Sequence, residues 1–240
     1  MTQSIPYCGM APIPAELLQR WNFDPALLIA LSALTAFGLL ARISVNRLSY
    51  MAGMIVLVVC FVSPLCALSS ALFSARSAHH LLIVCLAAPL LAHALPAIKL
   101  PVSLSLIAAV KGGVLALWHV PGVYDASLSS DVVYWLLQAG LLVSAVLFWS
   151  RLKEASAPSA LAALAGIMTV MGLIGAILTF APQPLFAAHL TTTWAWGLSA
   201  LEDQQLAGLI MWAISLPVYV LAAAVIAGRL VSGAQREAIA

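Results

Sequence analysis

The scarcity of charge along this chain constrains its fold more than any other feature. Only 8% of the 240 residues are charged, while 64% are hydrophobic, and a soluble domain carries about 25% charged residues. So few charges cannot solvate the surface of a globular chain of this length. We therefore expect most of the surface to face a lipid bilayer. The chain contains no basic run, so nucleic acid is not an expected partner.

Apolar runs close to the length of a membrane-spanning helix, about 20 residues, recur along the whole chain. The alternation of apolar and polar residues that marks a membrane β-barrel is absent. Because a helix satisfies its own backbone hydrogen bonds in lipid, the pattern predicts an all-α integral membrane bundle of about seven transmembrane helices. The predicted spans are residues 25–41, 48–68, 78–98, 101–118, 132–149, 160–180 and 204–227.

The Lys and Arg residues between these runs predict the orientation of the bundle, because cytoplasmic loops are enriched in them. We expect the N-terminus outside the cytoplasm and the C-terminus inside it. This gives a short extracytoplasmic segment over residues 1–24, one transmembrane domain over residues 25–228 and a cytoplasmic tail over residues 229–240. The basic residues assigned to the cytoplasmic side are Arg42, Arg47, Lys99, Arg151, Lys153, Arg229 and Arg236, and those assigned to the other side are Arg20 and Arg76.

This topology brings four of the five histidines to the extracytoplasmic ends of the predicted helices. Neutral imidazole binds copper, zinc and iron well, and nearby carboxylates act as ligands or orient the rings. The sequence therefore predicts a metal site at this face. The candidate ligands are His79, His80, His119 and His189, with Asp125 and Asp203 beside them.

Simpler interpretations of the same residues stay open. Interfacial histidines often form no more than hydrogen bonds at the level of the lipid headgroups. Asp131 and Asp203 each stand just before an apolar helical run, which is typical of an N-cap, and Asp125 follows a Pro-Gly turn. The pattern also predicts an aromatic belt at the membrane surface, formed by Trp118, Trp194 and Trp196.

Lys111 is the one charge placed inside a predicted span. A central lysine costs roughly 2.5 to 3.5 kcal/mol on insertion scales. Its side chain either faces an internal polar cavity that leads towards His119 or reaches back to the membrane surface.

The four cysteines, Cys8, Cys60, Cys66 and Cys85, form no CxxC pair. We expect reduced thiols and no disulfide framework. In the reduced form Cys66, near the extracytoplasmic end of the second span, offers a soft ligand to Cu(I).

Several segments carry a resemblance to one family. They are HHLLIVCLAAPLL from His79, LWHVPGVYDASL from Leu117, VVYWLLQAGLLVSAVLFW from Val132, LTFAPQPLFAAHL from Leu178 and LEDQQLAGLIMW from Leu201. With these segments the chain resembles bacterial cytochrome c oxidase assembly factors of the CtaG type, multi-pass membrane proteins linked to copper delivery. The resemblance implies a bacterial inner (plasma) membrane location, no enzymatic turnover, copper as Cu(I), and a membrane-embedded oxidase subunit as the partner. Association into a homo-oligomer stays open.

The resemblance assigns copper binding to His80, His119 and His189, with Asp125 or Asp203 in support. The chain departs from the family in the fifth span. Many members have a His-x-x-Glu-His arrangement there, and this chain has Tyr134, Leu137 and Gln138. One set of metal ligands is therefore absent or reduced to a hydroxyl and an amide.

Other classes of function fit less well. A metal-free accessory subunit of an oxidase is the main alternative, because of the departure in the fifth span. A haem-binding oxidoreductase has His80 and His93 on one helix but lacks a second ligand at the level of His93. The seventh span contains no lysine, which excludes a retinal Schiff base there, and the two halves show no clear repeat, which weakens a transporter.

Overall fold

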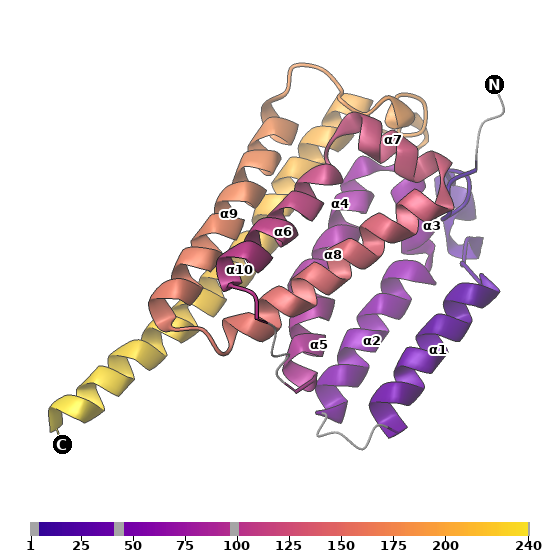
Figure 1. The fold of residues 1–240 in the computed structure, drawn as a ribbon. Helices are drawn as coiled ribbons and strands as arrows, with labels where there is room; N and C mark the ends of the chain where they lie inside the picture. The colour runs from indigo at the N-terminus through magenta and orange to yellow at the C-terminus, as the bar shows by residue number, and fades with distance from the viewer. Residues whose placement is uncertain (1–4, 41–45, 97–100, 240) are drawn as a thin grey trace.

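The computed structural model describes residues 5–40, 46–96 and 101–239, with side chains up to residue 232, and every regular element in these ranges is helical (Figure 1). Short 3-10 turns occupy Pro14–Gln19, Ala187–His189 and Trp194–Trp196, and a π-helical segment occupies Leu82–Ala87. The α-helices are α1 (Pro25–Leu40), α2 (Arg47–Phe61), α3 (Pro64–Ala71), α4 (Phe73–Leu81), α5 (Ala88–Ala94), α6 (Leu104–Leu117), α7 (Pro121–Ser129), α8 (Asp131–Leu152), α9 (Ala157–Phe180) and α10 (Ala200–Ile239).

The predicted all-α membrane bundle is confirmed. Four continuous helical stretches are long and apolar enough to cross a bilayer, and six are if the bent pairs α2–α3 and α6–α7 each count as one span. Helix α1 is a further, shorter apolar helix of 16 residues. The central span runs from Phe73 to Ala94 through α4, the π-helical segment and α5, and it is the most deeply buried of the four.

The bends in the spans have local causes. A proline at the start of a helix cannot donate a backbone hydrogen bond, and α3 begins at Pro64 after a bend of 47° from α2. The same applies to Pro121 at the start of α7, which is bent by 74° from α6. The π-helical segment ends directly before α5, which carries Pro89 in its first turn. Pro64 and Pro89 thus coincide with irregular backbone.

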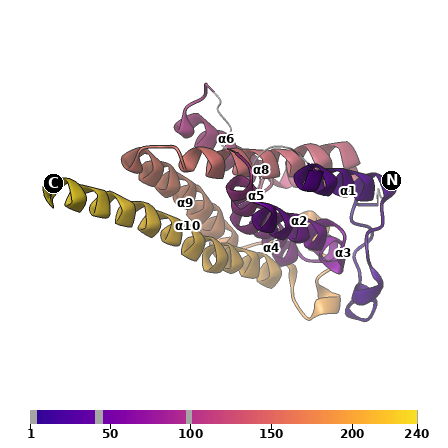
Figure 2. The same cartoon turned by 90° about the horizontal axis from the view of Figure 1, so that it is seen from below.

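Helices α9 and α10 approach closely because glycines meet at their contact. A Cβ atom built on Gly208 would lie 2.5 Å from the carbonyl oxygen of Gly175. Helix α10 has 40 residues, about 60 Å at the usual rise, which is about twice the hydrocarbon thickness of a bilayer. Its C-terminal part projects beyond the other helices (Figures 1 and 2). The predicted seventh span, residues 204–227, lies within this helix.

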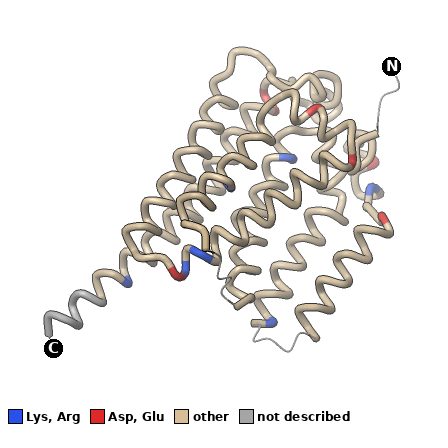
Figure 3. The backbone as a smooth tube through the Cα atoms, in the orientation of Figure 1, with Lys and Arg blue, Asp and Glu red and all other residues tan. Residues whose placement is uncertain are grey.

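The two ends of the bundle differ in charge. We call the end that holds α3, α7 and the connection of residues 181–199 the α7 end, and the opposite end, where α5 finishes, the α5 end (Figure 1). Most Lys and Arg positions lie near the α5 end, and most Asp and Glu positions lie near the α7 end (Figure 3). The predicted charge asymmetry is thus present among the described residues. Arg42 and Lys99, which the orientation prediction used, lie outside them.

Candidate functional site

A cluster of buried polar side chains lies at the α7 end, where α4, α7, α8 and the end of α6 meet. Its members come from segments far apart in the sequence. Aromatic rings lie between several of them, and the hydroxyls of Tyr124 and Tyr134 lie within interaction range of Arg76. They are Arg76, His79, His80, Trp118, His119, Tyr124, Tyr134, Gln138 and His189.

Arg76 is the charged centre of this cluster. Its side chain is 1% exposed, and its guanidinium carbon lies 5.8 Å from the ring centroid of Trp118 and 5.5 Å from that of Tyr134. Its Nε and Nη1 atoms have no hydrogen-bond partner in the described part of the chain. The prediction that placed Arg76 in a loop between two spans is wrong, because α4 begins at Phe73 and includes it.

Asp203 explains why α4 begins so early. Its carboxylate, on α10, accepts hydrogen bonds from the backbone N–H groups of Phe73, at 2.6 Å, and of Ser74, at 3.2 Å, and from the Ser74 hydroxyl. Asp203 therefore caps a helix, as its residue type predicts, but the helix is α4 and not its own. The N-cap prediction for Asp131 is also wrong by one residue, because Ser130 fills that position and accepts from Val133.

His79 and His80 lie on α4 within one turn of Arg76. They are 0% and 2% exposed, with ring centroids 5.7 Å apart. Both ring nitrogens of His79 and Nε2 of His80 lack a hydrogen-bond partner among the described atoms. The His80 ring lies 4.3 Å from that of Trp118. Trp118 is itself 1% exposed, so its predicted place in an aromatic belt is wrong, whereas Trp194 is exposed.

His119 follows α6 and is partly exposed. Its Nδ1 lies 2.7 Å from the carbonyl oxygen of Leu115. A carbonyl oxygen only accepts, so Nδ1 carries the proton and the lone pair is on Nε2. This tautomer suits metal binding, because a metal-bound histidine usually donates its other N–H to a carbonyl or a carboxylate. His119 also lies close enough to His80 for the charges of the two rings to interact.

His189 is held by hydrogen bonds at both ring nitrogens. Nδ1 lies 3.2 Å from the carbonyl oxygen of Ala71 and therefore donates to it. Nε2 then accepts from the hydroxyl of Tyr124 at 2.6 Å. Burial lowers the pKa of His189 to about 4, so the ring is neutral at pH 7. Its lone pair is therefore already used by Tyr124.

The predicted ligands do not form one compact set. Asp125 is exposed on α7, where it lines a surface pocket with Leu128 and Thr192. Asp203 is occupied by the start of α4. Within residues 5–40, 46–96 and 101–232 there is no group of three or more His, Cys, Asp or Glu side chains that could hold a metal ion. The structure does bring the ring of His80 next to that of His79, with centroids 5.7 Å apart, and close enough to His119 for the charges of the two rings to interact.

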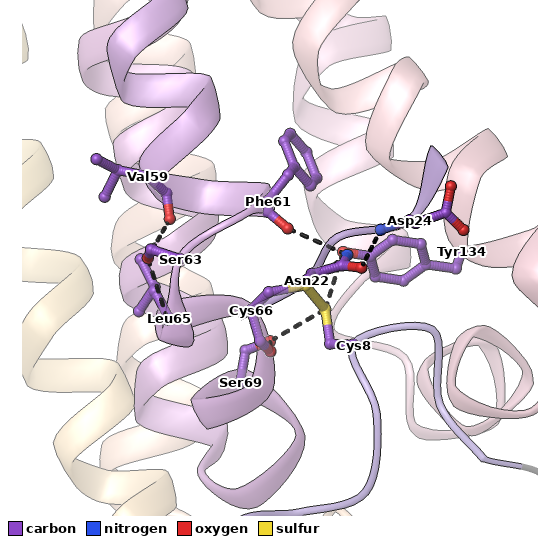
Figure 4. The surroundings of a disulfide bond; sticks show 10 residues. All are labelled: Cys8, Asn22, Asp24, Val59, Phe61, Ser63, Leu65, Cys66, Ser69 and Tyr134. Atoms are coloured by element: carbon purple, nitrogen blue, oxygen red, sulfur yellow. Dashed lines mark hydrogen bonds between the residues drawn. A yellow bond between two sulfur atoms is a disulfide. The ribbon is translucent and has the colours of Figure 1, made fainter. Parts of the chain in front are cut away.

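A disulfide joins Cys8 to Cys66 at the α7 end (Figure 4). The Cα atoms are 5.2 Å apart and the residues are 58 positions apart in sequence. The expectation of reduced thiols without a disulfide is therefore wrong for this pair, and Cys66 is not a free ligand for Cu(I). Spacing gave no signal, because the pair forms only when the N-terminal segment folds back over α3, where Asn22 also donates to the carbonyl of Phe61 at 3.2 Å. Cys60 and Cys85 are free and buried.

Lys111 lies inside the bundle and does not reach the membrane surface. It is 1% exposed, and its Nζ donates to the hydroxyl of Tyr219 on α10 at 2.7 Å. The rings of Phe148 and Tyr219 lie 4.9 Å and 5.0 Å from Nζ. A cation between aromatic faces and a hydroxyl is stabilised without a carboxylate. The predicted internal position of Lys111 is therefore confirmed, whereas a polar cavity leading from it towards His119 stays a prediction.

A comparison with protein families identifies the chain. The model of the family described as cytochrome c oxidase caa3 assembly factor (Caa3_CtaG) matches residues 102–232, more than half of the 240 residues. The chain belongs to this family. No curated protein and no solved structure matches the chain.

In this assembly-factor chain the matched region runs from the start of α6 into α10. It contains Lys111, His119, His189 and Asp203 but not α4. Arg76, His79 and His80 therefore lie outside the part that defines the family match. The sequence analysis did not single out Arg76 as a site residue. The sequence signal for it is its place three positions before the His79–His80 pair.

Proposed function

We propose that this protein is a non-catalytic assembly factor for a haem–copper terminal oxidase, and that it handles Cu(I) on its way to the oxidase. The observation that carries the proposal is the family match over residues 102–232, which covers more than half of the chain. The expected partner is the membrane-embedded catalytic subunit of the oxidase, met within the bilayer of the bacterial inner membrane. Association into a homo-oligomer is an open expectation of the same proposal.

The proposed copper ligands are His80 and His119, with His79 beside His80. Their support is the set of ring nitrogens on His79 and His80 that have no hydrogen-bond partner in the described structure. The tautomer of His119 also supports the proposal, because Nδ1 donates to the carbonyl oxygen of Leu115 and the lone pair of Nε2 is free to bind a metal. Imidazole is a good copper ligand, and Cu(I) tolerates low coordination. A site of two or three histidines, without a fourth ligand, suits a cargo that must be passed on.

The remaining predicted ligands are proposed to support the site and not to bind copper directly. His189, Asp125 and Asp203 each have another role or another position in the described geometry. They would join the copper only if the α7 end rearranged. We assign them to the support of the site: Asp203 fixes the start of α4, and His189 ties the connection between α9 and α10 to α7 and α3.

We place the α7 end outside the cytoplasm. The disulfide between Cys8 and Cys66 supports this, because disulfides persist in the periplasm and outside the cell and are rare in the cytosol. The gathering of Lys and Arg near the opposite end supports the same orientation (Figure 3). Labelling of a cysteine introduced at Ser129 by an impermeant reagent applied from outside the cytoplasm tests it. Protection at Ser129 with labelling at Ser156 would reverse the orientation.

A second candidate function is a metal-free accessory subunit beside the oxidase. Its support is that the described residues contain no three-ligand metal group. The charge of Arg76 also acts on the rings of His79 and His80, and a fixed cation opposes the binding of another cation. In this role the protein would stabilise an oxidase subunit during assembly through its helices alone.

Copper content after anaerobic Cu(I) loading separates the two functions. The wild-type protein in detergent is compared with a His80→Ala, His119→Ala double variant and with His93→Ala, a matched control at the α5 end. About one copper per chain in the wild type and the control, and none in the double variant, supports the proposed site. Absence of copper from all three proteins, with each still folded, favours the metal-free accessory role.

A further inference from the structure

Arg76 carries a permanent charge, and no acidic side chain among the described residues forms an ion pair with it. Arginine keeps its proton in proteins, and this side chain is 1% exposed. The ion pairs among the described side chains lie elsewhere, between Arg20 and Glu16 and between Arg151 and Glu154. An uncompensated charge buried in a membrane protein is strongly unfavourable. Its presence in a fully buried position, with no ion pair to an acidic side chain of the described residues, therefore points to a negative partner other than those side chains.

The nearest carboxylate with a defined role is already occupied. Asp203 accepts three hydrogen bonds from Phe73 and Ser74 at the start of α4. Those donors saturate the side of the carboxylate that faces α4, and Asp203 forms no ion pair with Arg76 within 4 Å. The guanidinium therefore remains without a counter-ion inside the bundle.

The groups around Arg76 are mainly hydrogen-bond donors. Trp118 and Gln138 are each 1% exposed, and the indole Nε1 and both amide atoms have no hydrogen-bond partner in the described structure. Tyr134 connects them, because its ring lies 6.1 Å from that of Trp118 and it precedes Gln138 by one helical turn. Guanidinium and indole groups only donate. The unpartnered atoms of Arg76, Trp118 and Gln138 together number four donors and one acceptor, and His79 and His80, about one turn along α4, add ring nitrogens that lack a partner in the described structure.

This composition selects the class of ligand. A metal cation would meet a positive charge and N–H groups. A water molecule could satisfy hydrogen bonds here, but it would leave the charge of Arg76 uncancelled. A small inorganic anion accepts from all the donors and cancels the charge. We propose that Arg76, Trp118 and Gln138 bind a small monovalent anion of the halide class, with chloride as the natural occupant.

The proposal is independent of copper. It concerns the guanidinium and its neighbouring N–H groups, and it holds for a metal-handling protein and for a metal-free accessory subunit alike. It assigns Trp118 as a reporter, because an indole beside a bound iodide loses fluorescence. Trp118 is 1% exposed, so iodide that only collides from bulk solvent does not reach it.

Iodide titration of the full chain in detergent, in gluconate buffer without other halides, tests the site. We expect a saturable loss of tryptophan fluorescence in the wild type, above the linear quenching of exposed residues such as Trp194. Trp118→Phe should lose the saturable part and keep the linear part. Arg76→Gln should weaken halide binding by about tenfold or more, because a charge-assisted hydrogen bond is lost. Arg151→Gln, a paired arginine near the α5 end, should bind like the wild type.

Thermal stability gives a second measurement that does not depend on any variant. A ligand that binds only the folded state raises the melting temperature, so wild type should melt higher in chloride than in gluconate at equal ionic strength. Saturable quenching that survives in Arg76→Gln would place the halide elsewhere and overturn the proposal. Linear quenching alone, with equal melting temperatures in the two salts, would also overturn it and leave Arg76 stabilised by its aromatic contacts only.

Discussion

The bundle buries two cations at different depths, and their surroundings differ sharply. Lys111 has a hydroxyl acceptor at 2.7 Å from Tyr219 and two aromatic faces within 5.0 Å. Arg76 has the rings of Trp118 and Tyr134, and two of its nitrogens have no hydrogen-bond partner in the described structure. The ammonium of Lys111 therefore has its hydrogen-bond acceptor inside the bundle, whereas the region around Arg76 contains polar atoms without a hydrogen-bond partner in the described structure.

This difference distinguishes a buried cation that stabilises the fold from buried polar groups that are available to bind a ligand. A buried polar group without a partner costs stability, so it persists where a ligand or partner satisfies it. The α7 end concentrates such atoms on Arg76, His79, His80, Trp118 and Gln138. Near Lys111 the chain uses its cation as a structural link between α6 and α10. We therefore expect variants near Lys111 to change stability, and variants near Arg76 to change binding.

The largest effect should follow removal of the disulfide that closes the α7 end. Cys66→Ser opens a link across 58 residues, which the chain-entropy relation values at about 4 kcal/mol. The N-terminal segment would then be held over α3 by weaker contacts such as that of Asn22. Unfolding by SDS titration in mixed micelles measures the loss. A reductant should destabilise the wild type to the same extent and leave Cys66→Ser unchanged; equal sensitivity of both proteins would contradict a role for the bond.

The next largest effect should come from the Lys111 region. Tyr219→Phe leaves the buried ammonium without its oxygen acceptor and should cost about 2 to 3 kcal/mol. Tyr50→Phe is a matched control, because the Tyr50 hydroxyl donates to a neutral carbonyl, that of Leu34, at 2.6 Å. That variant should cost only about 1 kcal/mol. Equal losses in the same SDS titration would show that the charge of Lys111 is not stabilised by Tyr219.

Acidification should affect the α7 end through His189. Its pKa is lowered to about 4 by burial in the folded state, whereas an unfolded histidine titrates near 6.5. The unfolded state therefore binds the proton more readily, and stability falls as the pH drops through the window from about 6.5 to 4. The loss should reach about 2 kcal/mol at pH 5.

His189→Gln is the variant that isolates this effect. It should reduce the difference in unfolding free energy between pH 7 and pH 5, while Tyr219→Phe should leave that difference unchanged. A wild-type protein equally stable at both pH values would show that His189 is not buried neutral beside Tyr124.

The two cations also show how much of the structure could be predicted from the sequence. Apolar runs determined the spans, because burial in lipid requires them, and the family motifs identified the chain. Lys111 was recognisable as an internal charge, although not its partner on α10, which is 108 positions away. Arg76 was misplaced, because α4 begins early only through the carboxylate of Asp203, 129 or more positions away. The disulfide was missed for the same reason, because a pairing between residues 58 positions apart leaves no pattern in the local sequence.

The smallest effect, and the sharpest test of the contrast, should come from Gln138. Its amide has no hydrogen-bond partner in the described structure, so Gln138→Leu removes a buried unsatisfied group of similar size. In gluconate buffer this variant should be about 1 kcal/mol more stable than the wild type. In chloride the gain should shrink, because the wild type then uses the amide N–H to hold the anion. A loss of stability in both salts would mean that Gln138 has a partner within the protein, and the Arg76 region would then be as complete as the region around Lys111.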